Sequence, residues 1–269
     1  MIIELLDGRQ LDIEKYSLKR LYHHIPSISL AHTTESVEGR DGSIFLNTTF
    51  TDRVITVELL YQSYDIYDYY LLRDEINALF SRKESFFIIF KNEPYKRYLV
   101  RLNQSFEVTP NQHMDSFKVE FTCVNVFGES VADTRSLKQW DDNKWAWNGQ
   151  ITWDDDLQYS FNANSFVVKN VGNVNIDPRQ SELEITLKGT FASSVVITNE
   201  TTGDVYIYNG SLTANDILVL KGVQSFKNGT SVFKNTNKKL IRLSAGENHF
   251  TITGGTVSSV DFNFRFLYL

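Results

Sequence analysis

The residues with the clearest chemical potential lie in one short stretch, residues 132–164, where all four tryptophans occur beside two aspartate runs. The tryptophans are Trp140, Trp145, Trp147 and Trp153, and the runs are Asp141-Asp142 and Asp154-Asp155-Asp156. An indole offers a large flat apolar face with a polar edge, so tryptophans near carboxylates can form a platform for a sugar ring. The alternative is that the tryptophans are buried and anchor a linker to the two domains that it joins, because burying a tryptophan stabilises the position of a segment by several kcal/mol. We favour the anchoring interpretation and keep the four tryptophans as candidate contacts for a carbohydrate or a partner protein.

The longer aspartate run is not a persuasive catalytic or metal site. A glycosidase needs two carboxylates that face each other across a cleft, whereas Asp154–Asp156 is typical of a solvated loop. The spacing, the glycine and the terminal glutamate of an EF-hand are absent. The sequence also contains no HExxH, GxSxG, Walker loop or glycine-rich fingerprint after a strand. We therefore expect no catalytic residue, no metal site and no cofactor, and a protein that is not an enzyme.

The histidines and the single cysteine do not add a reactive site. Adjacent residues on a strand point to opposite faces, so His23 and His24 would not chelate a metal together, and we expect a solvated pair. The other three histidines are scattered and suggest no nucleophile–base arrangement. Cys123 is alone, which excludes an internal disulfide and a thiolate metal cluster. It lies in an alternating strand pattern, so we expect a buried, inert thiol.

Length and composition favour a mostly-β protein of one large or two ordinary domains. The 269 residues include 13 Tyr and 19 Phe but only 4 Pro, and Val, Ile and Thr recur in short alternating runs. The net charge is −6, and residues 1–136 carry 15 basic and 20 acidic side chains, which is not the basic footprint of a nucleic-acid-binding protein. The N-terminus is too acidic for a signal peptide, and no apolar run is long enough for a membrane span.

One stretch in the first half departs from the alternating pattern and repeats its apolar residues at helical spacing. The apolar stripe consists of Tyr69, Leu72, Ile76, Leu79 and Phe80. Ser63, Asp65 or Asp68 could cap the start, and Arg82 and Lys83 suit the negative end of the helix dipole. The spacing predicts one amphipathic helix of about four turns.

The strands around this helix predict a first domain over residues 1–131. Arg53–Tyr61 alternates apolar and mixed positions, whereas Ser85–Phe90 is apolar on both faces and should be a central strand. Tyr95–Leu102 should return as its hairpin partner, and Ser116–Phe127 is a further alternating strand. Because a single helix with one apolar face is not stable alone, it must lie across this sheet.

A polar excursion, Thr33–Asn47, interrupts the first domain. Its centre reads Glu38, Gly39, Arg40, Asp41 and Gly42. Two glycines around an acidic–basic core are typical of an exposed loop tip between extended arms. The segment is either an arm that a partner orders or a mobile surface hairpin.

Residues 165–269 carry short strand patterns at sandwich spacing and no helical stripe. We expect strands over Ser165–Asn170, Glu182–Lys188, Ser194–Asn199, Asp204–Tyr208, Asp216–Leu220, Thr230–Lys234, Lys239–Leu243, Glu247–Ile252 and Val260–Leu269. Turn signals separate them, including Gly254-Gly255. The pattern predicts an antiparallel jelly-roll-like β-sandwich. Its last strand should bury an aromatic column, namely Phe262, Phe264, Phe266 and Tyr268.

The order and spacing of these features resemble the distal tail protein (Dit) family of siphophages. The features in the first domain are the loop at 38–42, Arg53–Glu58, the single helix and Phe86–Phe90. Those in the second are Asn170–Asn173, Asn199–Asp204, Tyr208–Leu212, Gly246–Asn248 and Asp261–Phe266. The Trp-rich segment 132–164 matches no pattern of the family, and we interpret it as a linker.

The resemblance implies a mainly β fold with a tail-tube-like β-sandwich and one flanking α-helix in the first domain, and a galectin-like β-sandwich in the second. It implies a ring, usually a hexamer, that joins the major tail tube protein to the tail-associated lysin or tip protein. The second domain would dock a receptor-binding protein, and phage DNA would pass through the lumen without sequence-specific binding. The protein would be assembled in the host cytoplasm and reside in the virion at the distal end of the tail, with no membrane partner.

Two hypotheses and one alternative follow. A ring needs one surface to fit a different one, so we expect Glu38–Gly42 to reach a neighbouring subunit, with Arg40 and Asp41 in ion pairs across the contact. We also expect mild negative charge in the first domain to suit a DNA channel, because positive charge would hold the duplex. The alternative is that the C-terminal domain binds host cell-wall polysaccharide.

Overall fold

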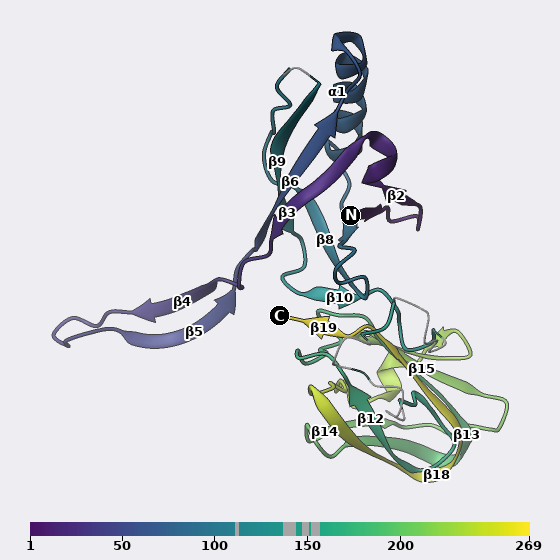
Figure 1. Cartoon of the computed structure of the whole chain (residues 1–269). Coiled ribbons are helices and arrows are strands. Elements are labelled where there is room, and N and C mark those ends of the chain that lie inside the picture. Colours follow the sequence, from purple (N-terminus) through teal and green to yellow (C-terminus); the bar gives the residue numbers. More distant parts are fainter. Residues whose placement is uncertain (111–112, 137–143, 147–150, 152–156) are drawn as a thin grey trace. The chain divides into compact units, whose positions relative to one another are not determined.

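The computed structural model of the chain describes residues 1–110, 113–136, 144–146, 151 and 157–269 (Figure 1). It divides into two compact units, one of Met1–Gly128 with Leu269 and one of Glu129–Tyr268. The division falls three residues before the predicted domain end at 131, and the described part of the Trp-rich segment belongs to the second unit. We describe each unit by itself.

The first unit is built on one antiparallel sheet with the strand order β2-β1-β7-β8-β9-β6-β3. Its strands are β1 (Ile2–Glu4), β2 (Gln10–Asp12), β3 (Leu18–His24), β6 (Val54–Gln62), β7 (Phe86–Ile89), β8 (Lys96–Leu102) and β9 (Met114–Cys123), with a 3-10 turn, η1 (Ile13–Tyr16), before β3. Strand β7 pairs on both sides, with β1 and with β8, which confirms the central position predicted from its two apolar faces.

The helix α1 (Ile66–Phe80) covers this sheet, as the helical spacing predicted. The Asp65 carboxylate caps its start by accepting a hydrogen bond from the Asp68 backbone N–H at 2.8 Å. At the other end, Arg82 Nε donates to the Leu79 carbonyl at 3.0 Å. All five residues of the predicted apolar stripe are buried, and the Phe80 ring lies 5.7 Å from that of Phe121 on β9. The stripe is thus the seam between helix and sheet.

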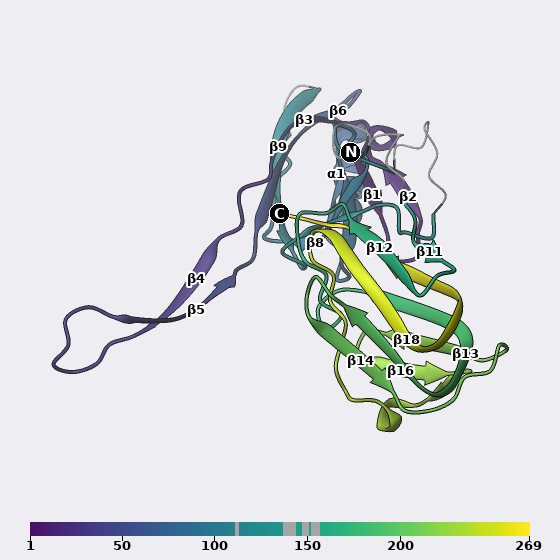
Figure 2. The ribbon, with the colours of Figure 1, turned by 90° about the horizontal axis from the view of Figure 1, so that it is seen from below.

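Two strands of the first unit stand apart from this sheet. They are β4 (Leu30–Glu35) and β5 (Ile44–Phe50), which pair only with each other in the described part of the chain. Figure 1 shows them as a long arm that leaves the sheet where β3 ends and β6 begins, and Figure 2 shows it from below. We call residues 30–50 the arm. It corresponds to the extended segments predicted on both sides of Glu38–Gly42.

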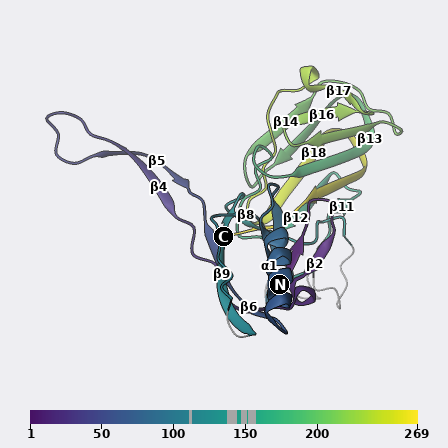
Figure 3. The ribbon, with the colours of Figure 1, turned by 90° about the horizontal axis from the view of Figure 1, so that it is seen from above.

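The second unit is all-β apart from a 3-10 turn in the part that the structure describes, which confirms the mainly β prediction. The sheet order is β11-β18-β13-β15-β16-β17, with β12 on β18 and β14 on β13. The strands of this sheet are β11 (Ser160–Phe161), β12 (Ser165–Asn170), β13 (Leu183–Asn199), β14 (Asp204–Tyr208), β15 (Ile217–Lys221), β16 (Gln224–Lys227), β17 (Thr230–Ser231) and β18 (Gly246–Phe264), and the turn is η2 (Phe233–Asn235). Two short strands, β10 (Gly128–Ser130) and β19 (Leu267–Tyr268), pair with each other and do not belong to this sheet. Figure 3 shows β13 and β18 side by side, bending together.

Strands β13 and β18 are both longer than predicted, and β18 is longer because Gly254-Gly255 is not a turn. Both glycines lie inside β18, where Gly255 pairs with Phe191 of β13 next to a bulge. A Cβ on Gly255 would lie 2.1 Å from the Thr190 carbonyl oxygen. Glycine is therefore required here for the close approach of two backbones, which is its other role in strands.

The predicted strand Lys239–Leu243 is wrong, and so is most of Thr230–Lys234. Leu243 makes one isolated bridge to Ile176, while β17 ends at Ser231. The reason lies in Asn237, whose side-chain oxygen accepts from the Ile207 N–H at 3.1 Å while its amide nitrogen donates to the Val205 carbonyl at 2.8 Å. The side chain covers the edge of β14, so this segment needs no ladder of its own. Strand β16 was not predicted.

The predicted aromatic column is confirmed. Phe262, Phe264, Phe266 and Tyr268 are all buried. Ring contacts extend the column into the core: Phe250 lies 4.9 Å from Phe262, and Tyr159 meets Phe264 edge-on at 5.6 Å. The aromatic side chains of β18 and of the segment after it therefore hold the second unit together.

Candidate interaction surfaces

Of the candidate reactive residues, His23 and Cys123 are built into the packing, whereas the other histidines are exposed. His23 is not solvated as expected but stacks on Phe90 at 4.0 Å, and burial together with the Arg20 charge holds its pKa below the usual range. His24 is exposed. Cys123 is buried as predicted, and burial raises the pKa of its thiol. The described residues contain no cluster of three or more His, Cys, Asp or Glu side chains able to hold a metal ion.

Of the four candidate tryptophans, only Trp145 lies within the described residues. Trp140, Trp147 and Trp153 lie outside them, as does the run Asp154–Asp156. Trp145 is 4% exposed and meets the Phe266 ring edge-on at 6.4 Å. In this position the indole packs within the second unit, and the contact of the four tryptophans with a carbohydrate or a partner stays a prediction.

The five residues of the candidate subunit contact lie together at the end of the arm. Glu38, Gly39, Arg40, Asp41 and Gly42 are all exposed. Gly39 and Gly42 have φ of +84° and +81°, the left-handed region that favours glycine. One turn hydrogen bond closes the tip, from the Arg40 N–H to the Val37 carbonyl at 3.1 Å. In the part of the chain that the structure describes, Arg40 and Asp41 make no ion pair, so their charges face solvent.

The arm behind this tip has one face with exposed apolar side chains, of which Phe50 also meets the Phe127 ring edge-on at 5.6 Å. The β4–β5 register places Leu30 opposite Phe50 and Thr34 opposite Phe45, and the His32 ring lies 6.1 Å from that of Phe45. Leu30, Phe45 and Phe50 are exposed, Phe45 by 61%. An isolated two-stranded ribbon is marginally stable in water. The arm therefore presents apolar surface of the kind that a partner covers.

A second apolar surface lies on the outer side of α1, which the sequence analysis did not identify. It consists of Tyr64, Ile66, Tyr67, Tyr70 and Leu71, all exposed, with Tyr67 at 77%. We call it the α1 patch. The sequence contains a pattern that indicates this patch, because Tyr67, Tyr70 and Leu71 follow the i, i+3, i+4 spacing of a second apolar stripe. Exposed tyrosines in such a group are typical of protein interfaces.

In the described part of the chain, β2 and β3 are the outer strands of the first unit's sheet and leave its edges open. Such edges present backbone N–H and C=O groups that can pair with another chain. A bulge between Arg20 and Tyr22 interrupts the pairing of β3 with β6 and leaves Leu21 exposed.

Among the described residues, no helix combines the length and the apolarity that crossing a membrane requires.

Comparison with known proteins shows what the sequence and the fold of this chain resemble. Residues 10–123 match the family model of the phage tail protein RIFT-related domain. Over 98% of both chains, the structure resembles that of the SPP1 Dit (gp 19.1) protein, described as a paradigm of hub adsorption apparatus in Gram-positive infecting phages, at 14% identity and a TM-score of 0.69.

Two further structures are baseplates of phage p2 in the activated conformation, with Sr at 11% identity and a TM-score of 0.43, and with Ca at 10% and 0.44. Each comparison covers 98% of this chain and 96% or 97% of the other. No curated protein matches the sequence. Residues 10–123 are therefore similar to the phage tail protein RIFT-related domain, and the whole chain shares the fold of SPP1 Dit, the fold that the resemblance implied.

Proposed function

We propose that this chain is a structural hub of a bacteriophage tail tip, located in the virion at the distal end of the tail. It forms a ring, with six copies as the expected number, that joins the tail tube to the tail-associated lysin or tip protein. The second unit docks a receptor-binding protein, and DNA passes through the lumen. The observation that carries the proposal is the exposure of Leu30 and Phe45 on the arm, within a region that matches the phage tail protein RIFT-related domain.

The arm suits ring formation for a physical reason. In a ring each copy offers one surface to a different surface of the next, so a projecting element and a receiving edge can both come from one chain. The arm supplies the projecting element, and the open edges at β2 and β3 supply places where a strand or hairpin can add by backbone hydrogen bonds. Arg40 and Asp41 at the tip then pair with charges on the neighbour.

Mass photometry and negative-stain microscopy test this contact. We expect the full chain, alone or mixed with the tail tube protein of the same phage, to form rings of one defined mass. Phe45→Asp, or replacement of residues 36–43 by Asn-Gly, should convert rings to single chains, because a buried charge or a missing tip removes the contact. Val167→Asp is the matched control, since Val167 is also an exposed apolar strand residue but lies on β12 of the second unit.

The outcomes separate the proposal from its alternatives. Rings that survive both arm variants would show that the arm is not the contact. Single chains from the wild type, even with the tail tube protein present, would contradict the hub. Circular dichroism of each variant checks that the fold is retained.

The charge of the first half supports the channel role. Residues 1–136 carry five more acidic than basic side chains, and a surface without excess positive charge releases few counterions from DNA. We expect the assembled ring to bind a DNA duplex weakly and with little dependence on salt. Tight binding that weakens steeply with salt would mean that the lumen is basic and would contradict this role.

A further inference from the structure

The α1 patch keeps most of its aromatic surface in solvent. Tyr64 and Tyr67 are 84% and 77% exposed, whereas Tyr70 is partly covered by the Tyr69 ring at 5.4 Å. Because a whole aromatic side chain has an area of roughly 150–250 Å², the three tyrosines of the patch expose roughly 400 Å². An exposed apolar surface of this size is typical of an interaction site.

A groove connects the α1 patch with the open edge at β3. Ser17, Leu18 and Lys19 line it where β3 begins, and Tyr64 and Asp68 line it where α1 begins. Its volume of about 780 Å³ leaves room for the side chains of an extended segment. Tyr64 belongs to both the groove and the patch, so the β3 edge, the groove and the α1 patch form one continuous surface. We call it the receiving surface.

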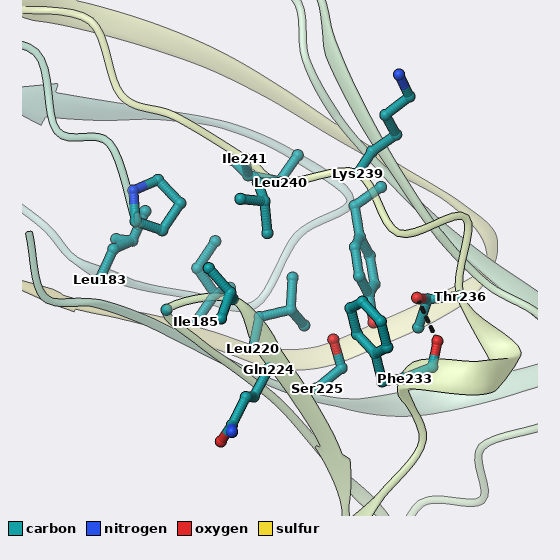
Figure 4. A pocket seen from close by; sticks show the side chains of 14 residues that line it. Leu183, Ile185, Leu220, Gln224, Ser225, Phe233, Thr236, Lys239, Leu240 and Ile241 are labelled. Carbon is teal, nitrogen blue, oxygen red and sulfur yellow. Dashed lines mark hydrogen bonds between the residues drawn. The ribbon is translucent and has the colours of Figure 1, made fainter. Parts of the chain in front are cut away.

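The pocket of the second unit that Figure 4 shows offers no such room. Leu183, Ile185 and Leu220, with the side chains around them, leave a cavity of about 20 Å³, near the volume of one water molecule. The Thr236 hydroxyl on its wall already donates a hydrogen bond to the Phe233 carbonyl at 2.8 Å. This pocket therefore belongs to the packing of the second unit, and the receiving surface is the better candidate for a partner.

The charged side chains that line the groove restrict its occupant. Glu14 pairs with Lys91 at 2.7 Å, and the Asp68 carboxylate accepts a hydrogen bond from the Tyr64 backbone N–H at 2.7 Å. Lys19 makes no ion pair in the described part of the chain. The groove therefore suits a mainly apolar segment that also brings a carboxylate for Lys19.

The arm of the same chain does not cover this surface. The arm leaves the sheet after the last residue of β3, whereas the groove lies at the first residues of that strand. Figure 1 and Figure 3 both show the arm extending away from α1. Covering the receiving surface therefore requires another molecule.

The arm of a second copy has the properties that the receiving surface requires. Leu30, Phe45 and Phe50 lie on one face of the arm, and their exposed parts amount to roughly 300 Å². The arm also has more acidic than basic side chains, so a carboxylate is available for Lys19. The charged residues of the arm are Glu35, Glu38, Arg40 and Asp41.

The two surfaces together are large enough for a specific contact. With Ile66 and Leu71, the patch and the arm offer roughly 1,000 Å² of exposed apolar surface, about the minimum for a specific interface. Contact between two α1 patches would bury a similar area, but it would close the assembly at two chains and leave the arm exposed. Contact between an arm and a patch joins two different surfaces, so it can continue from copy to copy around a ring.

We propose that the receiving surface binds the arm of a neighbouring copy of this chain. The apolar face of the arm packs on the tyrosines of α1, and the backbone of the arm runs along the edge of β3. The inference rests on the ring proposed above and names the surface of the neighbour that the arm contacts.

A mixture of two defective variants tests the proposal. Phe45→Asp damages only the arm and Tyr67→Asp only the patch, so each variant alone should remain single chains under the conditions in which the wild type forms rings. An equimolar mixture should form pairs with twice the mass of one chain and no rings, because it contains one intact combination of arm and patch. Sedimentation velocity distinguishes these species.

Asn77→Asp is the matched control for the patch variant. It adds the same charge to an exposed position of α1 outside the patch, and it should form rings like the wild type. Circular dichroism checks that each variant keeps its fold. Rings from Tyr67→Asp would show that the patch does not accept the arm, and single chains in the mixture would show that no arm binds the patch of another copy. Either result would overturn the proposal.

Cross-linking reports the same contact even where one contact alone is weak. Cys123 is buried, so in the double variant Phe45→Cys/Tyr67→Cys a short bismaleimide reaches the two introduced thiols. We expect a ladder of linked chains on a denaturing gel. Phe45→Cys/Val167→Cys, whose second thiol lies on β12, should remain unlinked. A link within one chain, or no link at all, would overturn the proposal.

These outcomes separate the receiving surface from the hub. Rings in the Tyr67→Asp variant, without a cross-link in the cysteine variant, would remove the receiving surface alone, because another surface would then accept the arm. If Tyr67→Asp rings failed to bind the tail tube protein, the patch would contact that protein and the proposal would be overturned. Absence of rings in the wild type, even with the tail tube protein present, would contradict the hub itself.

Discussion

The arm and the β13–β18 pair are both long antiparallel strand pairs that contain bulges, yet they have opposite environments. The aromatic residues at the end of β18 are buried among other rings, with Phe262 at 2% exposure, whereas Phe45 and Leu30 of the arm face solvent. Strand pairing alone therefore does not stabilise either pair. The β13–β18 pair buries its apolar face within its own unit, and the arm keeps an apolar face that only another molecule can bury.

The glycines in the two pairs repeat this difference. Gly254 has φ of +102°, and a Cβ there would lie 2.2 Å from the Ser194 carbonyl oxygen. Gly39 at the arm tip has a similar φ of +84° but no atom within 4 Å of the added carbon. In the β13–β18 pair glycine is needed for both conformation and space, and in the arm for conformation alone.

Truncation of one phenylalanine in each pair should give the largest difference. Phe262→Ala leaves a cavity between Phe166 and Phe250 and should lower the free energy of unfolding of the second unit by about 3–5 kcal/mol. Phe45→Ala should change it by less than about 0.5 kcal/mol, because the side chain is already exposed. Urea unfolding followed by tryptophan fluorescence reports the second unit, since Trp145 packs there against Phe266.

The effect of Phe45→Ala must also be measured on the first unit, because the arm belongs to that unit. Circular dichroism at the transition of the first unit should also show no shift for Phe45→Ala. If Phe45→Ala lowered the free energy of unfolding of the first unit by more than about 1 kcal/mol, Phe45 would be packed against its own unit and would not be available to a partner.

Alanine at the two glycines should give a smaller difference. Gly254→Ala forces a carbon into the Ser194 carbonyl and should cost about 2–3 kcal/mol in the second unit, from the conformation and the displaced strand together. Gly39→Ala carries only the conformational cost of about 1–2 kcal/mol, and it falls on the arm tip, so global unfolding should not change. Equal melting temperatures of the two variants would show that β18 can shift to accept a side chain.

The sequence predicted those features whose cause is local. The α1 stripe follows from a 3.6-residue repeat, the arm tip from two glycines around charged residues, and the buried aromatic column from alternation in the last strand. It failed where the cause is a contact distant in sequence. A Gly-Gly pair is compatible with a turn and with a bulge in a strand. Only the close approach of Gly255 to the Thr190 backbone shows that Gly254-Gly255 forms a bulge.

The interaction surfaces divide in the same way. The exposed tip could be found because polar and glycine residues indicate a loop, whereas the α1 patch could not be separated from core-facing aromatics by residue type. The segment after η2 likewise depends on Asn237, whose side chain bonds to the edge of β14 in place of a strand. No window of the sequence contains that arrangement.

Acid should lower the stability of the second unit, which contains Asp204, but not that of the arm. We expect this effect to be the smallest of the three predicted differences. Burial on its own would raise the pKa of Asp204, whose side chain is 14% exposed, but hydrogen bonds from the Arg242 side chain and backbone and from Thr202 outweigh it and hold this pKa below the usual range. The unfolded chain then binds the proton more readily than the folded one, so the stabilisation is complete above about pH 4 and is lost as the pH falls through the lowered pKa.

Urea unfolding of the wild type and of Asp204→Asn between pH 2 and 7 measures this contribution. The wild type should be the more stable near neutral pH, and the two curves should converge in acid, because protonated Asp204 no longer pairs with Arg242. Asp41→Asn removes one negative charge from the arm tip, where the described residues offer Asp41 no ion pair, and so controls for the change in net charge. Curves for Asp204→Asn that stay parallel to the wild type throughout would mean that solvent screens the pair. The strands of the second unit would then differ from the arm in their apolar packing and not in their electrostatics.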